Sequence, residues 1–294
     1  MAKPIPRFAP VISASRLEAV AGRFGIECGA DTLVRVSAAN LQSVRTGVSA
    51  PHVLFMPKRR TKRLALVTGA NRGIGLAIAR VLARQGCDLV ITGRDERALA
   101  KAARELGKFG GQVLAQTCDI RNPESVDYLF ALVRGLRIPL DILINNAGIG
   151  HPDQRIGELP YPTWCEVIDT NLTGLFLMTQ AALAIMRRGS TIVNNLSIAA
   201  ERVFPGSAAY NASKHGALGF TDTLREELRP KGIRVIALMP GATDTAIWKT
   251  LWPQAPRRKM MSAETVAKTV VNALLLPENS TAEKLILMPT SGAL

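Results

Sequence analysis

The 294-residue sequence predicts an α/β fold in which a doubly wound parallel sheet carries helices on both faces. Short apolar runs alternate with amphipathic segments from Leu64 onward, as in a parallel sheet with crossover helices. A glycine-rich turn, Thr68-Gly-Ala-Asn-Arg-Gly-Ile-Gly75, follows the first apolar run and opens the first helix. Hydrophobic residues make up 47% of the chain, which is ample for one buried core.

The first elements follow that alternation in order. Leu64–Thr68 is an apolar run of strand length, and the segment from Ile74 to Gln85 is predicted to be a helix. Asn122 can cap a later helix whose first turn contains Pro123, because Pro needs no backbone donor there. Between the helix that ends at Gln85 and the helix that follows Asn122, the sequence predicts strand Asp88–Thr92, helix Glu96–Leu106 and strand Gln112–Thr117.

The second half continues the pattern with longer helices. Asp141-Ile-Leu-Ile-Asn145 is typical of a buried strand, and Ser262 is placed to cap a helix. After strand 141–145 the sequence predicts a long helix over 163–187, strand 191–196, helix 207–229, strand 233–239, helix 263–276 and strand 284–288.

Residues 1–60 are predicted to be a flexible basic extension, which leaves 61–294 as a single core domain. This leader has no sustained period and contains several Pro and Gly breaks. Residues 1–63 hold eleven Lys and Arg against three Asp and Glu, more than half of the net charge of +14. Translation that begins at Met56 and a segment for organelle targeting stay open as alternatives, the second disfavoured by the acidic residues.

Composition excludes several classes of function. No run of 18 or more apolar residues is present, so we expect no membrane span. The basic run from Lys58 to Arg63 lacks aromatic residues and the body lacks a basic stripe, so we expect no nucleic-acid surface. The four cysteines are scattered without a Cys-x-x-Cys pair, so we expect no metal site and no disulfide framework. Reduced thiols are typical of a cytoplasmic protein.

Two motifs carry chemistry. In the glycine turn, Gly69, Gly73 and Gly75 let the backbone turn tightly and approach a pyrophosphate at the N-terminus of a helix. Tyr210 and Lys214 lie four residues apart, so they share one face of a helix. We expect the Lys214 ammonium to lower the pKa of the Tyr210 phenol, which would let it exchange protons beside a bound dinucleotide.

These motifs resemble those of the classical short-chain dehydrogenase/reductase superfamily over about residues 62–294. The Asn-Asn-Ala-Gly motif of that family is matched by Asn145, Asn146, Ala147 and Gly148. Its active-site serine is matched by Ser197, thirteen residues before Tyr210. The resemblance implies a Rossmann-type fold.

Further matches and one departure lie around this core. Asn171 is similar to the family's helix asparagine, and Pro240-Gly241 follows the sixth strand as in relatives. Thr245 stands where relatives contact the nicotinamide carboxamide. Many relatives carry two serines before the active-site stretch, whereas this chain has Asn194-Asn195-Leu196-Ser197.

The resemblance implies hydride transfer between a nicotinamide and a carbonyl or alcohol carbon. Tyr210 would give its proton to the carbonyl oxygen, and the Ser197 hydroxyl would stabilise the charge on that oxygen. Lys214 would hold the nicotinamide ribose, and Asn171 would bend its helix and hold a water of a proton relay.

The implied cofactor is NADP, and NAD is disfavoured. Gly93 ends the second strand where an NAD enzyme carries a carboxylate, and Arg94 and Arg72 are placed to hold a 2′-phosphate. Asp119 and Ile120 end the third strand, where relatives contact the adenine. The predicted cofactor-binding residues are Gly69, Asn71, Arg72, Gly73, Ile74, Gly75, Arg94, Asp119, Ile120, Asn145, Ala147, Gly148, Tyr210, Lys214, Pro240, Gly241, Thr243 and Thr245.

The substrate is predicted less closely. Segments 149–161, 198–204 and 243–256 should bound its pocket, and Ile247, Trp248, Leu251 and Trp252 form an apolar stripe suited to a lid. An apolar ketone or aldehyde is favoured, with a 3-oxoacyl-carrier-protein as the rival substrate. A non-catalytic nucleotide-sensing or interaction module is the alternative of another class.

Two smaller expectations complete the prediction. His151, in the loop after Gly148, is expected to be flexible and exposed. The resemblance implies a homodimer or homotetramer that pairs through the helices over 163–187 and 207–229.

Overall fold

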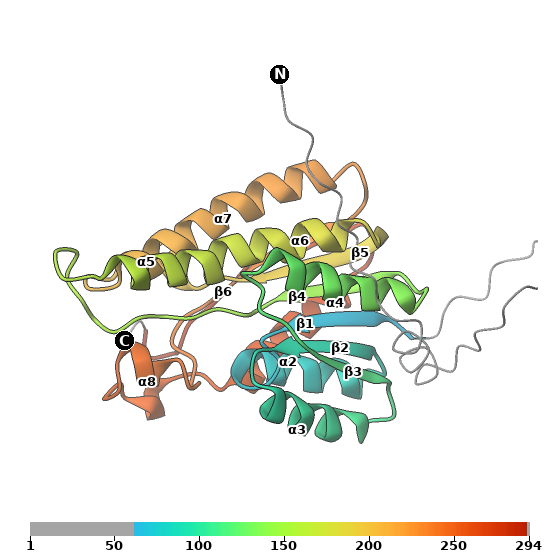
Figure 1. Cartoon of the computed structure of the whole chain (residues 1–294), viewed down its shortest axis with the longest axis horizontal. Helices are drawn as coiled ribbons and strands as arrows, with labels where there is room; N and C mark the ends of the chain where they lie inside the picture. Colours follow the sequence, from blue (N-terminus) through green and yellow to red (C-terminus); the bar gives the residue numbers. More distant parts are fainter. Residues whose placement is uncertain (1–61, 293–294) are drawn as a thin grey trace, which may run out of the picture.

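The computed structural model describes residues 62–292 and contains one seven-stranded parallel sheet with helices on both faces (Figure 1). The predicted extension over 1–60 lies outside the described residues. The strands are β1 (Leu64–Thr68), β2 (Asp88–Gly93), β3 (Val113–Thr117), β4 (Leu140–Asn145), β5 (Met186–Asn195), β6 (Arg234–Pro240) and β7 (Lys284–Leu287).

Helical elements follow the strands as crossovers. They are α2 (Gly73–Arg84), α3 (Glu96–Gly107), α4 (Pro123–Gly135), α5 (Tyr161–Ile168), the π-helical turn η1 (Asp169–Thr173), α6 (Gly174–Leu183), the 3₁₀ turn η2 (Ile198–Ala200), α7 (Ala208–Leu228), α8 (Trp248–Leu251), the 3₁₀ turn η3 (Arg257–Lys259) and α9 (Ala263–Leu274). The predicted caps are confirmed, because Asn122 accepts from the Ser125 amide and Ser262 from the Thr265 amide.

The sheet order β3-β2-β1-β4-β5-β6-β7 confirms the doubly wound fold. β1 lies between β2 and β4, so the chain direction across the sheet reverses at this point. In such a sheet the crevice beyond the carboxyl ends of the two central strands is where ligands bind. The glycine turn after β1 and the Asn-Asn-Ala-Gly motif after β4 meet there.

Two apolar layers cover the sheet. On one face Ala65 and Val67 pack with residues of α2, α3 and α9. On the other face Leu64 and Leu66 pack with residues of α4, α6 and α7. This alternation along β1 follows from the two-residue period of a strand. α4, α6 and α7 form the helical layer on the second face, and α5 lies in line with α6 (Figure 1).

The prediction of a long helix over 163–187 is wrong for the C-terminal end of that helix. α6 ends at Leu183 and β5 begins at Met186, so the last residues of the predicted helix belong to the strand. Gly189 adopts φ 87°, and the pairing of β5 with β4 shifts register between Leu140 and Ile142. A bulged start of the strand thus replaces the last helical turn. The π-helical turn η1 interrupts the remainder at the position where the bend was expected.

Candidate active site

The glycine turn wraps closely around the start of α2. Gly69 and Gly73 adopt φ values of 62° and 57°, which residues with a Cβ atom rarely adopt. A Cβ on Gly75 would lie 2.5 Å from the Gly69 carbonyl oxygen, so only glycine fits at that position. Because the backbone at Gly75 packs closely against Gly69, no side chain of the described residues covers the N-terminus of α2, and an anionic group can approach it.

Asn146 ties this turn to the end of β4. Its side-chain nitrogen donates to the carbonyl oxygens of Thr68 and Gly69 at 2.9 Å and 3.3 Å. The Thr68 hydroxyl oxygen accepts from the backbone amides of Asn146 and Ala147, both at 2.9 Å. Asn146 was not among the predicted binding residues, because its role depends on two strands that are distant in sequence.

Ser197, Tyr210 and Lys214 are brought together at the carboxyl end of β5. Ser197 precedes η2, and Tyr210 lies in the first turn of α7 with its hydroxyl hydrogen-bonded to the Ser197 side chain. Lys214, one turn further along α7, is 6% exposed. Its ammonium lies 5.6 Å from the centre of the Tyr210 ring and donates to the Asn195 carbonyl oxygen at 3.2 Å.

Burial dominates the electrostatics of these groups. It raises the pKa of the Tyr210 phenol, and the hydrogen bond with Ser197 opposes that rise. Burial also lowers the pKa of Lys214 to about 8. The Tyr210 pKa is therefore raised and not lowered as expected, because the desolvation of the phenolate outweighs the hydrogen bond with Ser197.

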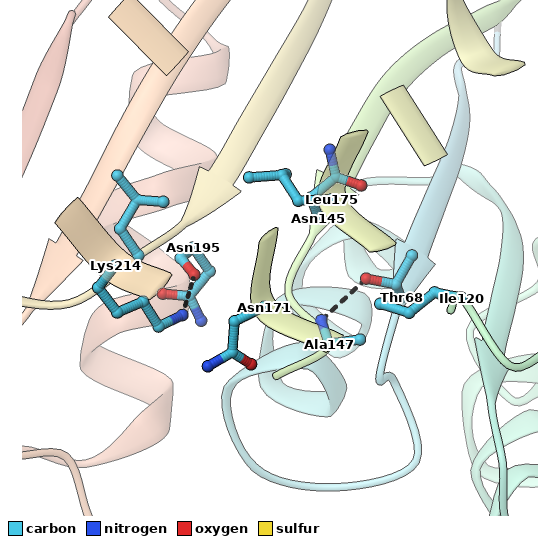
Figure 2. Close-up of a pocket in the computed structure, with 9 residues that line it drawn as sticks. Thr68, Ile120, Asn145, Ala147, Asn171, Leu175, Asn195 and Lys214 are labelled. Carbon is cyan, nitrogen blue, oxygen red and sulfur yellow. Dashed lines mark hydrogen bonds between the residues drawn. The ribbon is translucent and has the colours of Figure 1, made fainter. Parts of the chain in front are cut away.

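Asn171 lies in η1 and joins three parts of the site. Its side-chain oxygen accepts from the Ile149 amide at 2.8 Å, and its nitrogen donates to the Ile149 carbonyl oxygen at 2.9 Å. The same nitrogen donates to the Ser213 hydroxyl on α7 at 3.0 Å. Its side chain thus secures the loop after β4. A small pocket with room for about one water molecule lies between Asn171 and Lys214 (Figure 2).

A cleft of about 990 Å³ extends from the glycine turn past Tyr210 to α8. It is large enough for a dinucleotide and a small substrate. The predicted site residues that line it are Gly69, Asn71, Arg72, Gly73, Ile74, Arg94, Asp119, Ile120, Ala147, Gly148, Ser197, Tyr210, Lys214, Pro240, Gly241, Thr243 and Thr245.

Three predicted residues do not line the cleft. Gly75 allows close packing, and Asn171 lines the small pocket. Asn145, predicted to bind the cofactor, is 6% exposed and directs its side-chain nitrogen to Thr179 and Asn194 in the interior, both at 3.0 Å. The end of β4 presents Ala147 and Gly148 to the cleft instead.

The end of the cleft beside β2 combines cations with carboxylates. Arg72 and Arg94 are exposed there, and Arg94 lies 3.9 Å from Glu166 of α5. Arg121 lies 3.4 Å from Glu166 and binds Asp119 at 2.6 Å, which holds the pKa of the Asp119 carboxyl below its usual range. Arg121 and Glu166 were missed, because no local motif marks them.

The segment around α8 forms another wall of the cleft. The Trp248 indole donates to the Thr243 carbonyl oxygen at 2.8 Å, which anchors α8 to the end of β6. Leu251 packs against Gly150, where a Cβ would lie 2.8 Å from the Leu251 Cγ. The predicted stripe therefore lines the cleft, with Trp252 44% exposed at its edge.

His151 corrects one expectation. It is 2% exposed rather than flexible and exposed, and its Nδ1 lies 2.7 Å from the Pro152 carbonyl oxygen. Within residues 62–292 no cluster of three or more potential metal ligands is found. No helix in the same range is long and apolar enough to cross a membrane.

Sequence comparison relates the chain to oxidoreductases. The family model described as short chain dehydrogenase matches residues 63–256. A 3beta-hydroxysteroid dehydrogenase from Mediterraneibacter gnavus is 37% identical over 194 residues, which are 66% of this chain and 70% of the relative. A 3-oxoacyl-[acyl-carrier-protein] reductase from Synechocystis sp. is 39% identical over 63% of this chain and 76% of the relative.

Structural comparison agrees. An alcohol dehydrogenase from Thermococcus sibiricus, complexed with 5-hydroxy-NADP, superimposes with a TM-score of 0.72 at 32% identity. The match covers 78% of this chain and 97% of that one. A variant of the actinorhodin polyketide ketoreductase with NADPH has a TM-score of 0.69 at 33% identity, over 78% of this chain and 96% of that one.

Proposed function

We propose that this chain, which belongs to the short-chain dehydrogenase family, uses NADPH to reduce an apolar ketone or aldehyde. Family membership makes it an oxidoreductase that acts on CH–OH and C=O groups, so the non-catalytic module is set aside. The observation that carries the proposal is the grouping of Ser197, Tyr210 and Lys214 on the wall of a cleft that begins at the glycine turn.

The residues support acid catalysis in the reductive direction. A bound nicotinamide supplies the hydride. Because burial raises the Tyr210 pKa, the phenol stays protonated at neutral pH and can donate to the carbonyl oxygen as negative charge develops there. The Ser197 hydroxyl stabilises the same oxygen. With a pKa of about 8, Lys214 is mostly protonated at pH 7 and can donate to the ribose hydroxyls.

The cleft fits a dinucleotide with a 2′-phosphate. The absence of a Cβ at Gly75 allows the tight turn that a pyrophosphate needs, and the N-terminus of α2 faces the same space. Arg72 and Arg94 lie at the adenosine end, where cations favour NADP over NAD. Glu166 weakens this preference by pairing with Arg94. Parallel titrations with NADPH and NADH test it, and equal affinities would contradict NADP specificity.

An apolar carbonyl compound is the first candidate substrate, because Ile247, Trp248, Leu251 and Trp252 line the substrate end. A 3-oxoacyl thioester is the second candidate. Its support is the similarity to ketoacyl and 3-oxoacyl reductases. An NADPH-oxidation screen over ketones, aldehydes, quinones and 3-oxoacyl thioesters distinguishes them. Turnover of thioesters alone would favour the second, and no turnover in any class would contradict the reductase.

A homodimer or homotetramer and a cytoplasmic location complete the proposal. Phe176 on α6 is 41% exposed and lies edge-on to Phe220 of α7, with ring centres 6.3 Å apart. An apolar pair on the outer helices is suited to a contact between two copies. Light scattering tests the assembly, and a monomer would contradict it. The free buried thiols of Cys87 and Cys118 fit a reducing compartment.

A further inference from the structure

Asp153 is a carboxylate on the wall of the cleft that has no hydrogen-bond or ion-pair partner among the described residues. The other acidic side chains that line the cleft are engaged. Asp95 accepts a hydrogen bond from a backbone amide at the start of α3. Asp119 and Glu166 both pair with Arg121. The Asp153 carboxylate thus remains available to a ligand.

The backbone around Asp153 is tied to the start of α7. The Gln154 amide donates to the Gly206 carbonyl oxygen at 3.0 Å, and Gln154 pairs with Ser207 in a parallel bridge. The Asp153 Oδ1 atom occupies the space that a Cβ on Gly206 would fill, and Gly206 adopts φ 79°. The carboxylate is therefore held beside the end of α7 that carries Tyr210.

The loop that carries Asp153 also meets an apolar wall of the cleft. Leu251 of α8 packs against Gly150, which precedes Asp153 in the same loop. Phe204 and Ile247 line the same cleft. Ligand sites are mostly apolar, and a few fixed polar groups orient the ligand in them. An unpaired carboxylate between an apolar wall and the proposed proton donor fits that role.

We propose that Asp153 determines substrate specificity by accepting a hydrogen bond from a hydroxyl or ammonium group on the apolar body of the carbonyl substrate. The inference rests on the proposed function and narrows its substrate class to apolar ketones and aldehydes that carry such a donor away from the carbonyl carbon. A hydrogen bond to a carboxylate is charge-assisted and stronger than a neutral one. A substrate with a carboxylate of its own would bring two negative charges together, so it is disfavoured.

A homologous series of methyl ketones tests this, with chains that end in a methyl, hydroxymethyl, aminomethyl or carboxylate group. NADPH oxidation should give a higher kcat/KM for the hydroxyl and ammonium ketones than for the alkyl ketone. Asp153→Ala should lower this ratio about tenfold or more, because the charge-assisted hydrogen bond is lost. Asp153→Asn keeps an acceptor without the charge, so it should lower the ratio less for the hydroxyl ketone than for the ammonium ketone.

Glu158→Gln is the matched control, because it removes a negative charge from an exposed position of the same loop that does not line the cleft. It should leave the ratio unchanged. Gly206→Ala should lower the ratio as Asp153→Ala does, because its Cβ would overlap the Asp153 Oδ1 atom. If Gly206→Ala does not fold, the two Asp153 variants decide alone.

An unchanged ratio in Asp153→Ala would overturn the proposal, even if turnover of every ketone fell equally, because an equal loss would indicate a structural role. A wild-type preference for the carboxylate ketone would also overturn it and would assign recognition to Lys249 of α8, which lines the same cleft. Turnover of none of the ketones would instead count against the proposed function.

Discussion

The carboxylate of Glu166 lies 3.9 Å from the guanidinium of Arg94, at the end of the cleft beside β2. Glu166 also lies 3.4 Å from Arg121, which already holds Asp119. A 2′-phosphate that binds Arg94 must therefore compete with a carboxylate supplied by α5. In the proposed complex with NADPH, both signs of charge at this end would set the affinity.

We predict that Glu166→Gln tightens NADPH binding. Exposed ion pairs contribute about 0.2–1 kcal/mol, so releasing Arg94 should lower the Kd of NADPH about two- to fivefold. The Kd of NADH should not change, because NADH has no 2′-phosphate. Fluorescence titration measures both constants, with Glu124→Gln at the exposed start of α4 as the control. Weaker NADPH binding would show that Glu166 orients Arg94 rather than competing for it.

Arg94→Ala should have the opposite effect. Losing a charge-assisted hydrogen bond to a phosphate costs about 1.5–3 kcal/mol, so the Kd of NADPH should rise about 10- to 100-fold. The Kd of NADH should change little. Arg97→Ala, exposed in the first turns of α3, changes the net charge equally and should leave both constants unaltered. Equal losses for the two cofactors would refute the contact with the 2′-phosphate.

Tyr210→Phe tests the proton donor. It removes the phenolic hydroxyl and keeps the ring, so kcat for ketone reduction should fall at least about 100-fold while the Kd of NADPH stays within about twofold. Steady-state kinetics and fluorescence titration measure the two effects separately. Tyr128→Phe, on α4 and outside the cleft, is the matched control. Retained turnover in the Tyr210 variant would assign the proton to another group.

Motifs that are local in sequence were predictable. The glycine turn and the Tyr210–Lys214 pair act through spacings of a few residues, so their positions follow from strand and helix periods. The general alternation of elements followed for the same reason.

Features that depend on contacts between distant segments were not predictable. The end of α6 is decided by the pairing of β5 with β4, and the burial of His151 by the packing of its loop. Glu166 meets Arg94 only because α5 lies beside the end of β2. The pKa of Tyr210 was expected to fall because the neighbouring charge is visible in the sequence, whereas the desolvation that raises it is not.

Lys214→Met should stabilise the fold while it removes activity. Burial lowers the Lys214 pKa from 10.5 to about 8, which corresponds to a cost of about 3 kcal/mol for keeping the ammonium in the folded state. The hydrogen bond to Asn195 is lost in the variant, so we expect a net gain of about 1–3 kcal/mol at pH 7 and a melting temperature several degrees higher.

The gain should depend on pH in a defined direction. Below pH 8 Lys214 is charged in both the folded and the unfolded wild type, so the full free-energy cost of burying its ammonium is present. Between pH 8 and 10.5 the unfolded chain binds more protons, so the wild type gains stability as pH rises and the advantage of the variant shrinks. Thermal unfolding of both proteins from pH 6.5 to 9.5 measures this, with Lys268→Met on the exposed side of α9 as the control. A stability difference that is constant across this range, or a destabilised variant, would show that the Lys214 ammonium is well solvated by its partners in the folded protein.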